Sequence, residues 1–382
     1  MVSLYENHTI YKHNPVCYDR IKFTSRDGDT MKIEPNYQYF VKAMKNETPE
    51  RMPIYEHHID APFMEKATGQ ELCRLLDGTT AEKKLFFSRY IGFWRDHGYD
   101  IVSFERGIPQ SMPGSGSLRG HVPGVIRTRA DYDNYPWDKI PDWYFEQNGA
   151  YFELLAESMP ENMRAVGGPG YGVFESVEDI TGYMDLCYLS DDDPELYTDL
   201  FKAVGDVYRK IWQRFANDYS AAYCVFRMGD DLGFQTNTLI SYHDIRTHVL
   251  PVYRDIVEIA HRAGRPFLLH SCGKIFPVME DIIATGIDGK HSNEDAIAPF
   301  STWVSLYGDR ICNLGGIDMN VLCLKTEAEI REIVFRTIEE SVGHGGFALG
   351  SGNSIPDYVP VEGFLAMNRA ANEFRLSQMS AV

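Results

Sequence analysis

Short apolar, β-prone runs alternate with longer amphipathic segments along most of the chain, starting near residue 50. Segments such as AEKKLFFSRYIGFWRDHG and TEAEIREIVFRTIEESVG have apolar positions at helical spacing and end on glycine, as helices often do. Eight runs between such segments are predicted to be strands: 53–56, 100–104, 164–168, 223–228, 267–270, 287–290, 311–316 and 347–350. This α/β alternation predicts a closed (β/α)8 TIM barrel rather than an open sheet.

Two segments depart from this alternation. Residues 1–35 contain a pattern that predicts a hairpin turning at Asp27 and Gly28, and we expect them to form an N-terminal extension to a barrel of residues 36–382. The segment from Arg106 to about Trp143 follows the second predicted strand and is rich in Gly, Pro, Ser and Arg. It is too long for a simple connection, which favours a lid or substrate loop; a disordered surface insertion is the alternative.

Composition and charge narrow the class of protein. The sequence is 44% hydrophobic and 24% charged, as in an ordinary globular protein, and its formal charge of −18 argues against nucleic-acid or anionic-membrane surfaces. No apolar run approaches the roughly 18 residues of a membrane span, and the first residues do not resemble a signal peptide. Seven scattered cysteines do not suggest a disulfide framework. We therefore expect a cytoplasmic protein with reduced thiols.

Polar residues collect where the predicted strands end. In a parallel barrel this edge carries the chemistry, because the loops after the strands surround the mouth. The polar residues expected there are Glu56, His57, Arg106, Tyr171, Asp230, Asp231, His270, Cys272, His291, Glu294, Asp318, Ser351 and Asn353.

The stretch FLLHSCGK points to a metal ion. His270 and Cys272 are two residues apart, so on a strand their side chains face the same way. Zinc binds such a nitrogen and sulfur pair tetrahedrally, and Lys274 would favour the thiolate. The alternative is a buried cysteine beside a histidine that bonds to the backbone. Further metal ligands are expected from Glu56 and His291.

Acidic and polar residues on other strand ends suggest proton transfer and substrate binding. Of the adjacent Asp230 and Asp231, we expect one to handle protons and the other to cap a helix. The remaining predicted catalytic residues are His57 and Glu294, and the predicted substrate-binding residues are Arg106, Tyr171, Asp318, Ser351 and Asn353. Nucleotide-binding, GxSxG and catalytic-cysteine motifs are absent from the sequence.

The order of five motifs resembles a known family. Over roughly residues 50–378, the chain resembles the uroporphyrinogen decarboxylase superfamily, and in particular its corrinoid-dependent methyltransferase branch. The motifs that carry the resemblance are, in order, DDLGFQ, LPVYRDIVEIAH, LLHSCGK, GGID and ALGSGNSIPDYVPVEGFLAM. The resemblance also implies a (β/α)8 barrel. True decarboxylases of the family carry an RQAGR-like loop after the first strand and a GHG sequence near the eighth. This chain has YEHHIDAPF and GSG there, so the resemblance favours the methyltransferases.

The resemblance implies a zinc-dependent methyl transfer. The branch binds zinc through HxC, matched by His270 and Cys272, and through a distant cysteine, whose place Ser351 takes. The remaining ligands are then expected among Glu56, His57, His291 and Glu294. The methyl group would move between a small methylated compound, or a thiol or tetrahydrofolate acceptor, and a separate corrinoid protein, since the chain has no DxHxxG motif.

Two other functions remain open at this point. One is a decarboxylase that acts on a different acid, with arginines such as Arg106 and Arg227 binding its carboxylate. The other is a binding barrel without catalytic activity, which Ser351 suggests. A homodimer is compatible with the sequence, as barrels of this family often pair.

Overall fold

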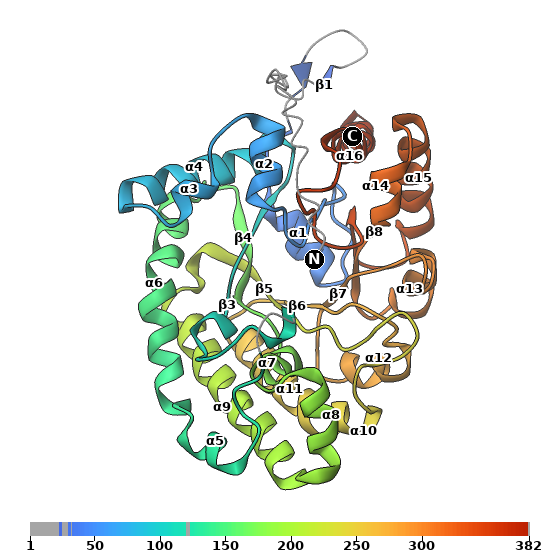
Figure 1. The fold of residues 1–382 in the computed structure, drawn as a ribbon. Coiled ribbons are helices and arrows are strands. Elements are labelled where there is room, and N and C mark those ends of the chain that lie inside the picture. The colour runs from blue at the N-terminus through green and yellow to red at the C-terminus, as the bar shows by residue number, and fades with distance from the viewer. Residues whose placement is uncertain (1–22, 25–29, 32, 120–122, 381–382) are drawn as a thin grey trace, which may run out of the picture.

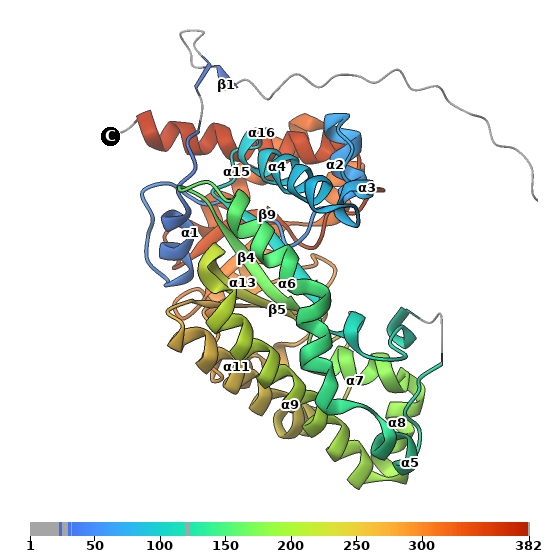
Figure 2. The same ribbon diagram turned by 90° about the vertical axis from the view of Figure 1, so that its left-hand side faces the viewer.

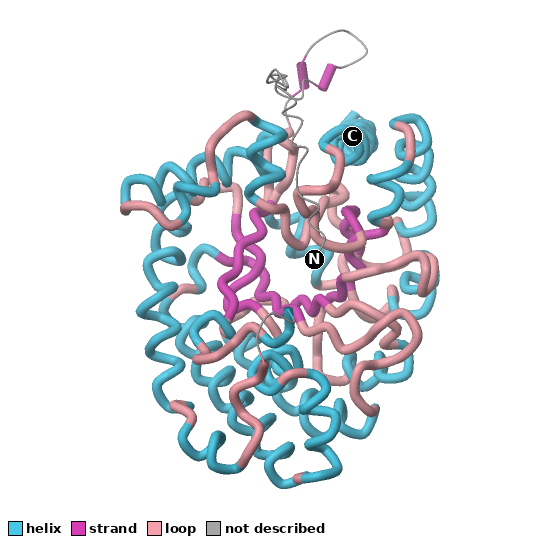
Figure 3. Tube along the Cα trace, in the orientation of Figure 1, coloured by secondary structure: helices cyan, strands magenta, loops and turns pink. Residues whose placement is uncertain are grey.

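The computed structural model describes residues 23–24, 30–31, 33–119 and 123–380. Its centre is a curled parallel sheet of seven strands surrounded by helices (Figures 1 and 3). The strands are neighbours in chain order: β3 (Ile101–Gly107), β4 (Arg164–Gly170), β5 (Tyr223–Gly229), β6 (Phe267–His270), β7 (Gly289–His291), β8 (Cys312–Ile317) and β9 (Phe347–Ser351). The predicted α/β barrel-type fold is confirmed.

The first predicted strand is reduced to a single bridge. Ile54 pairs in parallel with Leu349 of β9, and the Tyr55 amide donates to the Leu349 carbonyl at 2.8 Å. Towards β3, the main link is made by a side chain, because the Ser103 hydroxyl donates to the carbonyl of His57. The segment 53–57 therefore occupies the position of an eighth strand without forming a regular ladder on either side.

Helices cover the outside of the sheet. Three helices, α4, α5 and α15, follow a threonine N-cap with a capping box, and α4 and α15 begin where the sequence predicts. Figure 2 shows α5, α7 and α8 gathered away from α16. The helices are α1 (Tyr37–Met44), α2 (Ala61–Thr68), α3 (Cys73–Leu76), α4 (Thr80–Asp96), α5 (Arg129–Asn134), α6 (Ile140–Ser158), α7 (Val173–Thr181), α8 (Tyr183–Asp192), α9 (Pro194–Asp218), α10 (Tyr242–Asp244), α11 (Leu250–Arg262), α12 (Phe276–Ile283), α13 (Phe300–Tyr307), α14 (Met319–Leu324), α15 (Glu327–Ser341) and α16 (Val361–Ser380).

Two hydrophobic cores hold this arrangement together. The larger core lies between sheet and helices, and a smaller one fills the barrel interior. In the smaller core, Phe40 and Met44 of α1 pack with strand residues such as Val225 and Leu268. Helix α1 therefore closes one end of the barrel. In the described part of the chain, no helix combines the length and apolar character needed to cross a membrane.

The long segment after β3 is folded where the structure describes it. It contains α5 and short 3-10 turns, and Arg129 bonds to Asp199 of α9 at 2.6 Å. The Leu118 amide also donates to Asp179 of α7 at 2.8 Å. A disordered insertion is therefore wrong for the described part, whereas the lid function stays a prediction.

Little of the N-terminal extension is described. β1 (Phe23–Thr24) pairs antiparallel with β2 (Thr30–Met31), and the expected turn residues Asp27 and Gly28 lie outside the described residues. The division into an extension and a barrel at residue 35 stays a prediction.

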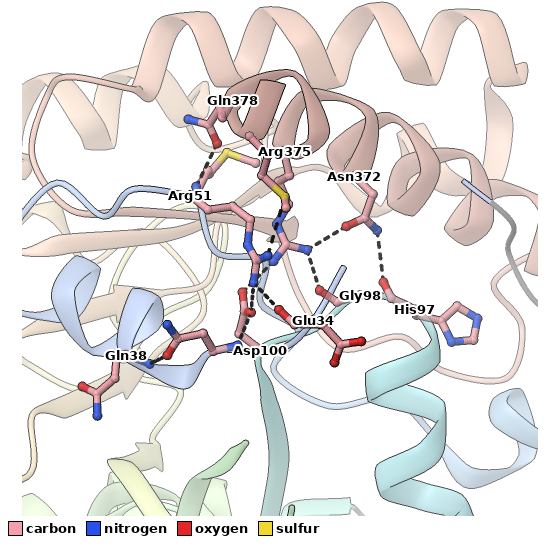
Figure 4. Close-up of polar contacts among 12 residues, drawn as sticks. Glu34, Gln38, Arg51, His97, Gly98, Asp100, Asn372, Arg375 and Gln378 are labelled. Atoms are coloured by element: carbon pink, nitrogen blue, oxygen red, sulfur yellow. Dashed lines mark hydrogen bonds and ion pairs between the residues drawn. The ribbon is translucent and has the colours of Figure 1, made fainter. Parts of the chain in front are cut away.

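A buried ionic cluster joins three segments at the N-terminal end of β3 (Figure 4). Asp100 accepts from Arg51 at 2.5 Å and from Arg375 of α16 at 2.6 Å, and all three side chains are buried. The same carboxylate accepts the amide of Asn36, the N-cap of α1, at 2.8 Å. The cluster therefore fastens α1 and α16 to the start of the sheet.

Candidate metal centre

The predicted strand-end residues come together at the ends of β5, β6 and β7. The register pairs Gly229 with His270 and His270 with His291, so these strand ends are level. Two groups bring possible metal ligands within 4.8 Å of one another: His57, His270 and His291 form one, and Asp231, His270 and Cys272 form the other. His270 belongs to both groups. The ring nitrogen of His270 that carries no proton determines which group can bind a metal ion.

A chain of hydrogen bonds fixes the tautomer of His270. Nε2 of His291 lies 2.9 Å from the carbonyl oxygen of Ser351, which can only accept, so this nitrogen carries a proton. Nδ1 of His291 is then an acceptor, and Nδ1 of His270 donates to it across 2.8 Å. Nε2 of His270 is left with a free lone pair. Such an outer hydrogen bond is how proteins orient a metal-binding histidine.

The free lone pair of His270 faces a thiol and a carboxylate. Nε2 lies 3.4 Å from Sγ of Cys272 and 3.7 Å from Oδ1 of Asp231. Zinc bond lengths and tetrahedral angles give ligand separations of about 3.3 to 3.6 Å. The group therefore fits zinc with one nitrogen, one sulfur and one oxygen, and leaves a position for substrate.

The surroundings of the Cys272 thiol also suit a cation. Burial, followed by the charge of Asp231, raises the thiol pKa well above its usual value. Ser292 and Asn353 each donate to Sγ at 3.4 Å. A divalent cation would reverse the pKa shift and convert the thiol to a bound thiolate.

The group of three histidines fits a metal less well. The 2.8 Å between the Nδ1 atoms of His270 and His291 is a hydrogen-bond distance, below the roughly 3.3 Å between two nitrogen ligands of zinc. The ring of His57 stacks on that of His270, with centroids 3.8 Å apart and planes 18° apart. Stacked rings keep their in-plane lone pairs side by side instead of directing them to one point. We interpret His291 as the partner of a ligand.

Glu56 and Ser351 are bonded to each other. The Ser351 hydroxyl donates to the Glu56 carboxylate, which also accepts the Ser351 amide at 3.2 Å. Burial raises the pKa of Glu56 to about 8, although the bonds from Ser351 oppose this shift. Glu56 was predicted to bind the metal, and Ser351 stands where the resemblance implies a cysteine. In the structure these two residues bond to each other and join the first strand segment to β9.

Asp230 and Asp231 divide the two roles predicted for them. Asp230 is fully buried and accepts the amides of Phe174 and Glu175, at 3.1 and 2.9 Å, so it caps α7. It also accepts from the Tyr253 hydroxyl at 2.7 Å, and burial raises its pKa to about 6. Asp231 is partly exposed and accepts the Cys272 amide at 2.8 Å.

Two predicted substrate-binding residues are engaged elsewhere. Arg106 donates to Asn148 of α6 at 2.8 Å and lies over the ring of Tyr151, 4.4 Å from its centroid. These contacts show that the Arg106 side chain faces the helix layer. The neighbouring Glu105, which bonds to Arg227, points to the opposite side of the strand. Asp318 caps α14 by accepting the Asn320 amide at 2.8 Å.

Two other predicted residues lie at strand ends beside the site. Tyr171 follows β4 with a left-handed backbone, φ 67°, a conformation that is costly for a tyrosine and frequent at functional sites. Glu294 follows β7 and is partly buried; burial lowers the pKa of nearby Lys290, and the charge of Glu294 opposes this shift.

Sequence reasoning missed two acids on α7. Burial raises the pKa of Glu178 to about 7, and nearby Asp230 adds to this shift. Burial and then Asp231 raise the pKa of Glu175 well above its usual value. The charge of Asp231 acts on both residues, so they lie near this candidate ligand. Their spacing of three residues, which places them on one helix face, was the available signal.

Lys290 on β7 was also missed. Its ammonium group donates to the Ser292 carbonyl and lies 3.7 Å from the ring centroid of Trp303. Burial lowers its pKa to about 7. In the sequence this lysine stands beside His291 with nothing that marks it as buried.

Comparisons with known proteins agree with the fold. The family model described as uroporphyrinogen decarboxylase matches residues 134–374, more than half of the chain. A methyltransferase from Methanosarcina mazei has a similar structure, with a TM-score of 0.66, 15% identity and coverage of 89% of this chain and 99% of that one. A protein described as a vitamin-B12-independent methionine synthase from Listeria monocytogenes has a TM-score of 0.50, 13% identity and coverage of 86% and 98%. No protein of curated function matches the sequence. The chain belongs to the uroporphyrinogen decarboxylase family.

Proposed function

We propose that the protein is a methyltransferase with a zinc ion bound by His270, Cys272 and Asp231. The methyl group moves between a separate corrinoid protein and a small methylated compound, or an acceptor such as a thiol or tetrahydrofolate. The observation that carries the proposal is the lone pair of His270, which faces sulfur and oxygen at 3.4 and 3.7 Å. The similar fold of the Methanosarcina mazei methyltransferase supports it.

Charge at the site argues for methyl transfer over decarboxylation of an acid. A substrate with several carboxylates needs free cations, but Arg227 pairs with Glu105 at 2.5 Å and Arg106 bonds to Asn148. The candidate ligand set instead includes the carboxylate of Asp231, which would disfavour a polyanionic substrate.

The protein residues have separate tasks in this mechanism. When bound, zinc supplies a Lewis acid that polarises a methoxy or amine leaving group or lowers the pKa of an acceptor thiol. His270, held by His291, orients the ligand set through its fixed tautomer. Burial and then the charge of Asp231 raise the pKa of Glu175, which favours its protonated form, so this residue can give a proton to the departing group.

Metal analysis with matched variants tests the proposal. The wild-type protein should bind one zinc ion per chain, and Cys272→Ala or His270→Ala should reduce zinc binding more than 10-fold. Cys73→Ala, at an exposed cysteine, and His261→Ala, at an exposed histidine, are matched controls that should keep the metal. Full zinc content in both site variants would overturn the ligand assignment. A zinc-loaded protein that transfers methyl groups to no corrinoid protein would overturn the function.

A further inference from the structure

Arg227 binds the segment of the first strand that carries His57. This β5 residue is fully buried, and its Nη2 pairs with Glu105 at 2.5 Å. Its Nη1 donates to the carbonyl of His57 at 2.6 Å, to Ser103 at 2.7 Å and to the Tyr55 hydroxyl at 3.1 Å. A guanidinium group only donates, so every one of these partners must accept from it.

The Tyr55 hydroxyl therefore has to place its own proton elsewhere. The ring is fully buried, and burial raises the Tyr55 pKa to about 12, so the proton stays on the oxygen. Among the described residues, the acceptor within reach is Nδ1 of His57 at 3.3 Å. A buried hydroxyl left without an acceptor is unfavourable, so Tyr55 donates to Nδ1. His57 then carries its proton on Nε2.

The two stacked imidazoles consequently present opposite groups. His270 directs a lone pair from Nε2 to the thiol and the carboxylate, whereas His57, stacked on it at 3.8 Å, carries an N–H at Nε2. In the described part of the chain, that N–H makes no hydrogen bond, and His57 is 8% exposed. A donor held this way beside the metal ligands is suited to a bound substrate.

We propose that His57 is a catalytic residue whose Nε2–H donates a hydrogen bond to the substrate atom that carries the methyl group, with Tyr55 and Arg227 as positioning residues. This inference rests on the proposed function. The bond between the methyl carbon and its heteroatom breaks, and the electron pair stays on the heteroatom. The reduced corrinoid of the partner protein, when bound, would supply the electron pair for the new bond to the methyl carbon. His57 keeps its proton and stabilises the charge on the heteroatom, as a neutral imidazole can.

The donor also selects a class of substrate. An N–H group needs a lone pair to bind, which a methoxy oxygen offers and a quaternary ammonium does not. The carboxylate of Asp231 disfavours an anionic methyl donor. The geometry therefore favours an uncharged methyl ether.

The tautomer can be measured without any activity. In protein labelled with ¹⁵N-histidine, long-range ¹⁵N–¹H spectra separate protonated from unprotonated ring nitrogens, and His57→Gln assigns the signals. We expect His57 to be protonated at Nε2 with and without zinc, and Tyr55→Phe to give a mixture of tautomers. A proton on Nδ1 in the wild type would overturn the proposal, and an unchanged tautomer in Tyr55→Phe would overturn the role of Tyr55.

Kinetics with methyl aryl ethers of different leaving-group strength tests the catalytic role. His57→Leu should lower kcat about 100-fold for poor leaving groups and only a few-fold for good ones, with little change in KM. His57→Gln, which keeps an N–H donor, should recover about 10-fold. An equal loss along the whole series would mean a structural role and overturn the proposal. If the wild-type protein transfers no methyl group, the proposed function fails, while the tautomer measurement still decides the geometry.

Discussion

The two ends of the barrel each bury a polar cluster, and the clusters differ in how their charges are balanced. At the N-terminal end, Asp100 accepts from Arg51 and Arg375, and opposite charges meet directly at 2.5 and 2.6 Å. At the C-terminal end, burial lowers the pKa of His291 to about 3 and raises the pKa of Cys272, so both groups are held neutral. The first cluster is complete within the protein, whereas the second presents neutral donor groups that a cation could bind.

This difference separates a structural role from a functional one. Buried charges that are paired and hydrogen-bonded fasten segments together, and removing one partner leaves the others uncompensated. In the second cluster, neutral side chains are buried and their lone pairs point towards one another. A metal ion bound there would stabilise these desolvated groups. Changes at the first end should therefore affect folding, and changes at the second should affect metal binding.

The largest expected effect comes from breaking the complete cluster. Asp100→Asn leaves two buried guanidinium groups without a carboxylate and should reduce the free energy of unfolding by about 3 to 5 kcal/mol. Urea denaturation measures the loss, and zinc content per folded chain should not change. The exposed pair between Arg331 and Glu373 is the control, and breaking it should have no measurable effect. A loss at Asp100 no greater than at this control would contradict the comparison.

Metal binding should stabilise only a protein with an intact second cluster. Zinc at 100 times its Kd should raise the free energy of unfolding of the wild type by about 2.7 kcal/mol. Cys272→Ala should show no such increase, because it removes the sulfur ligand. Thermal unfolding with and without zinc makes the measurement. Equal zinc stabilisation of both proteins would place the ion elsewhere.

The metal-free protein should lose stability as the pH falls. The folded pKa of His291 is lowered by burial to about 3, so its contribution is complete above about pH 6.5 and is lost between pH 6.5 and 3. Between pH 7 and 5 we expect the wild type to lose about 1 to 2 kcal/mol more stability than His291→Gln. The raised pKa of Glu56, about 8, acts in the opposite direction in both proteins, so their difference isolates His291. Parallel pH profiles of the two proteins would exclude a buried neutral histidine.

The smallest effect is expected where the family pattern suggests the largest. Ser351→Cys restores the expected cysteine, but the side chain at this position bonds to Glu56. We therefore expect zinc affinity to change less than about 3-fold, because the residue does not contact the metal ion. Competition with a chromophoric chelator measures it. A gain of 10-fold or more would show that residue 351 reaches the metal.

Local patterns were enough to predict most of the fold. Apolar runs between amphipathic segments identified the positions of β3 to β9, because a strand buried on both faces is apolar along its length. Residues 53–56 were predicted to form a regular strand, but they form a single bridge, between Ile54 and Leu349. There the pairing depends on side chains such as Ser103 and Arg227, which lie far away in the sequence.

The site was predictable where geometry follows from spacing. His270 and Cys272 are two residues apart on a strand, so their proximity could be inferred. Asp230 and Asp231 could not be distinguished, because the amides that Asp230 caps belong to Phe174 and Glu175, about 55 residues earlier. The tautomer of His270 likewise depends on contacts that only the fold brings together.

X-ray absorption at the zinc edge tests the central claim most directly. For the zinc-loaded protein, we expect one sulfur at about 2.3 Å and nitrogen or oxygen at about 2.0 to 2.2 Å, with the sulfur lost in Cys272→Ala. A spectrum without sulfur, or one that is the same in Cys272→Ala, would contradict a centre made by His270, Cys272 and Asp231.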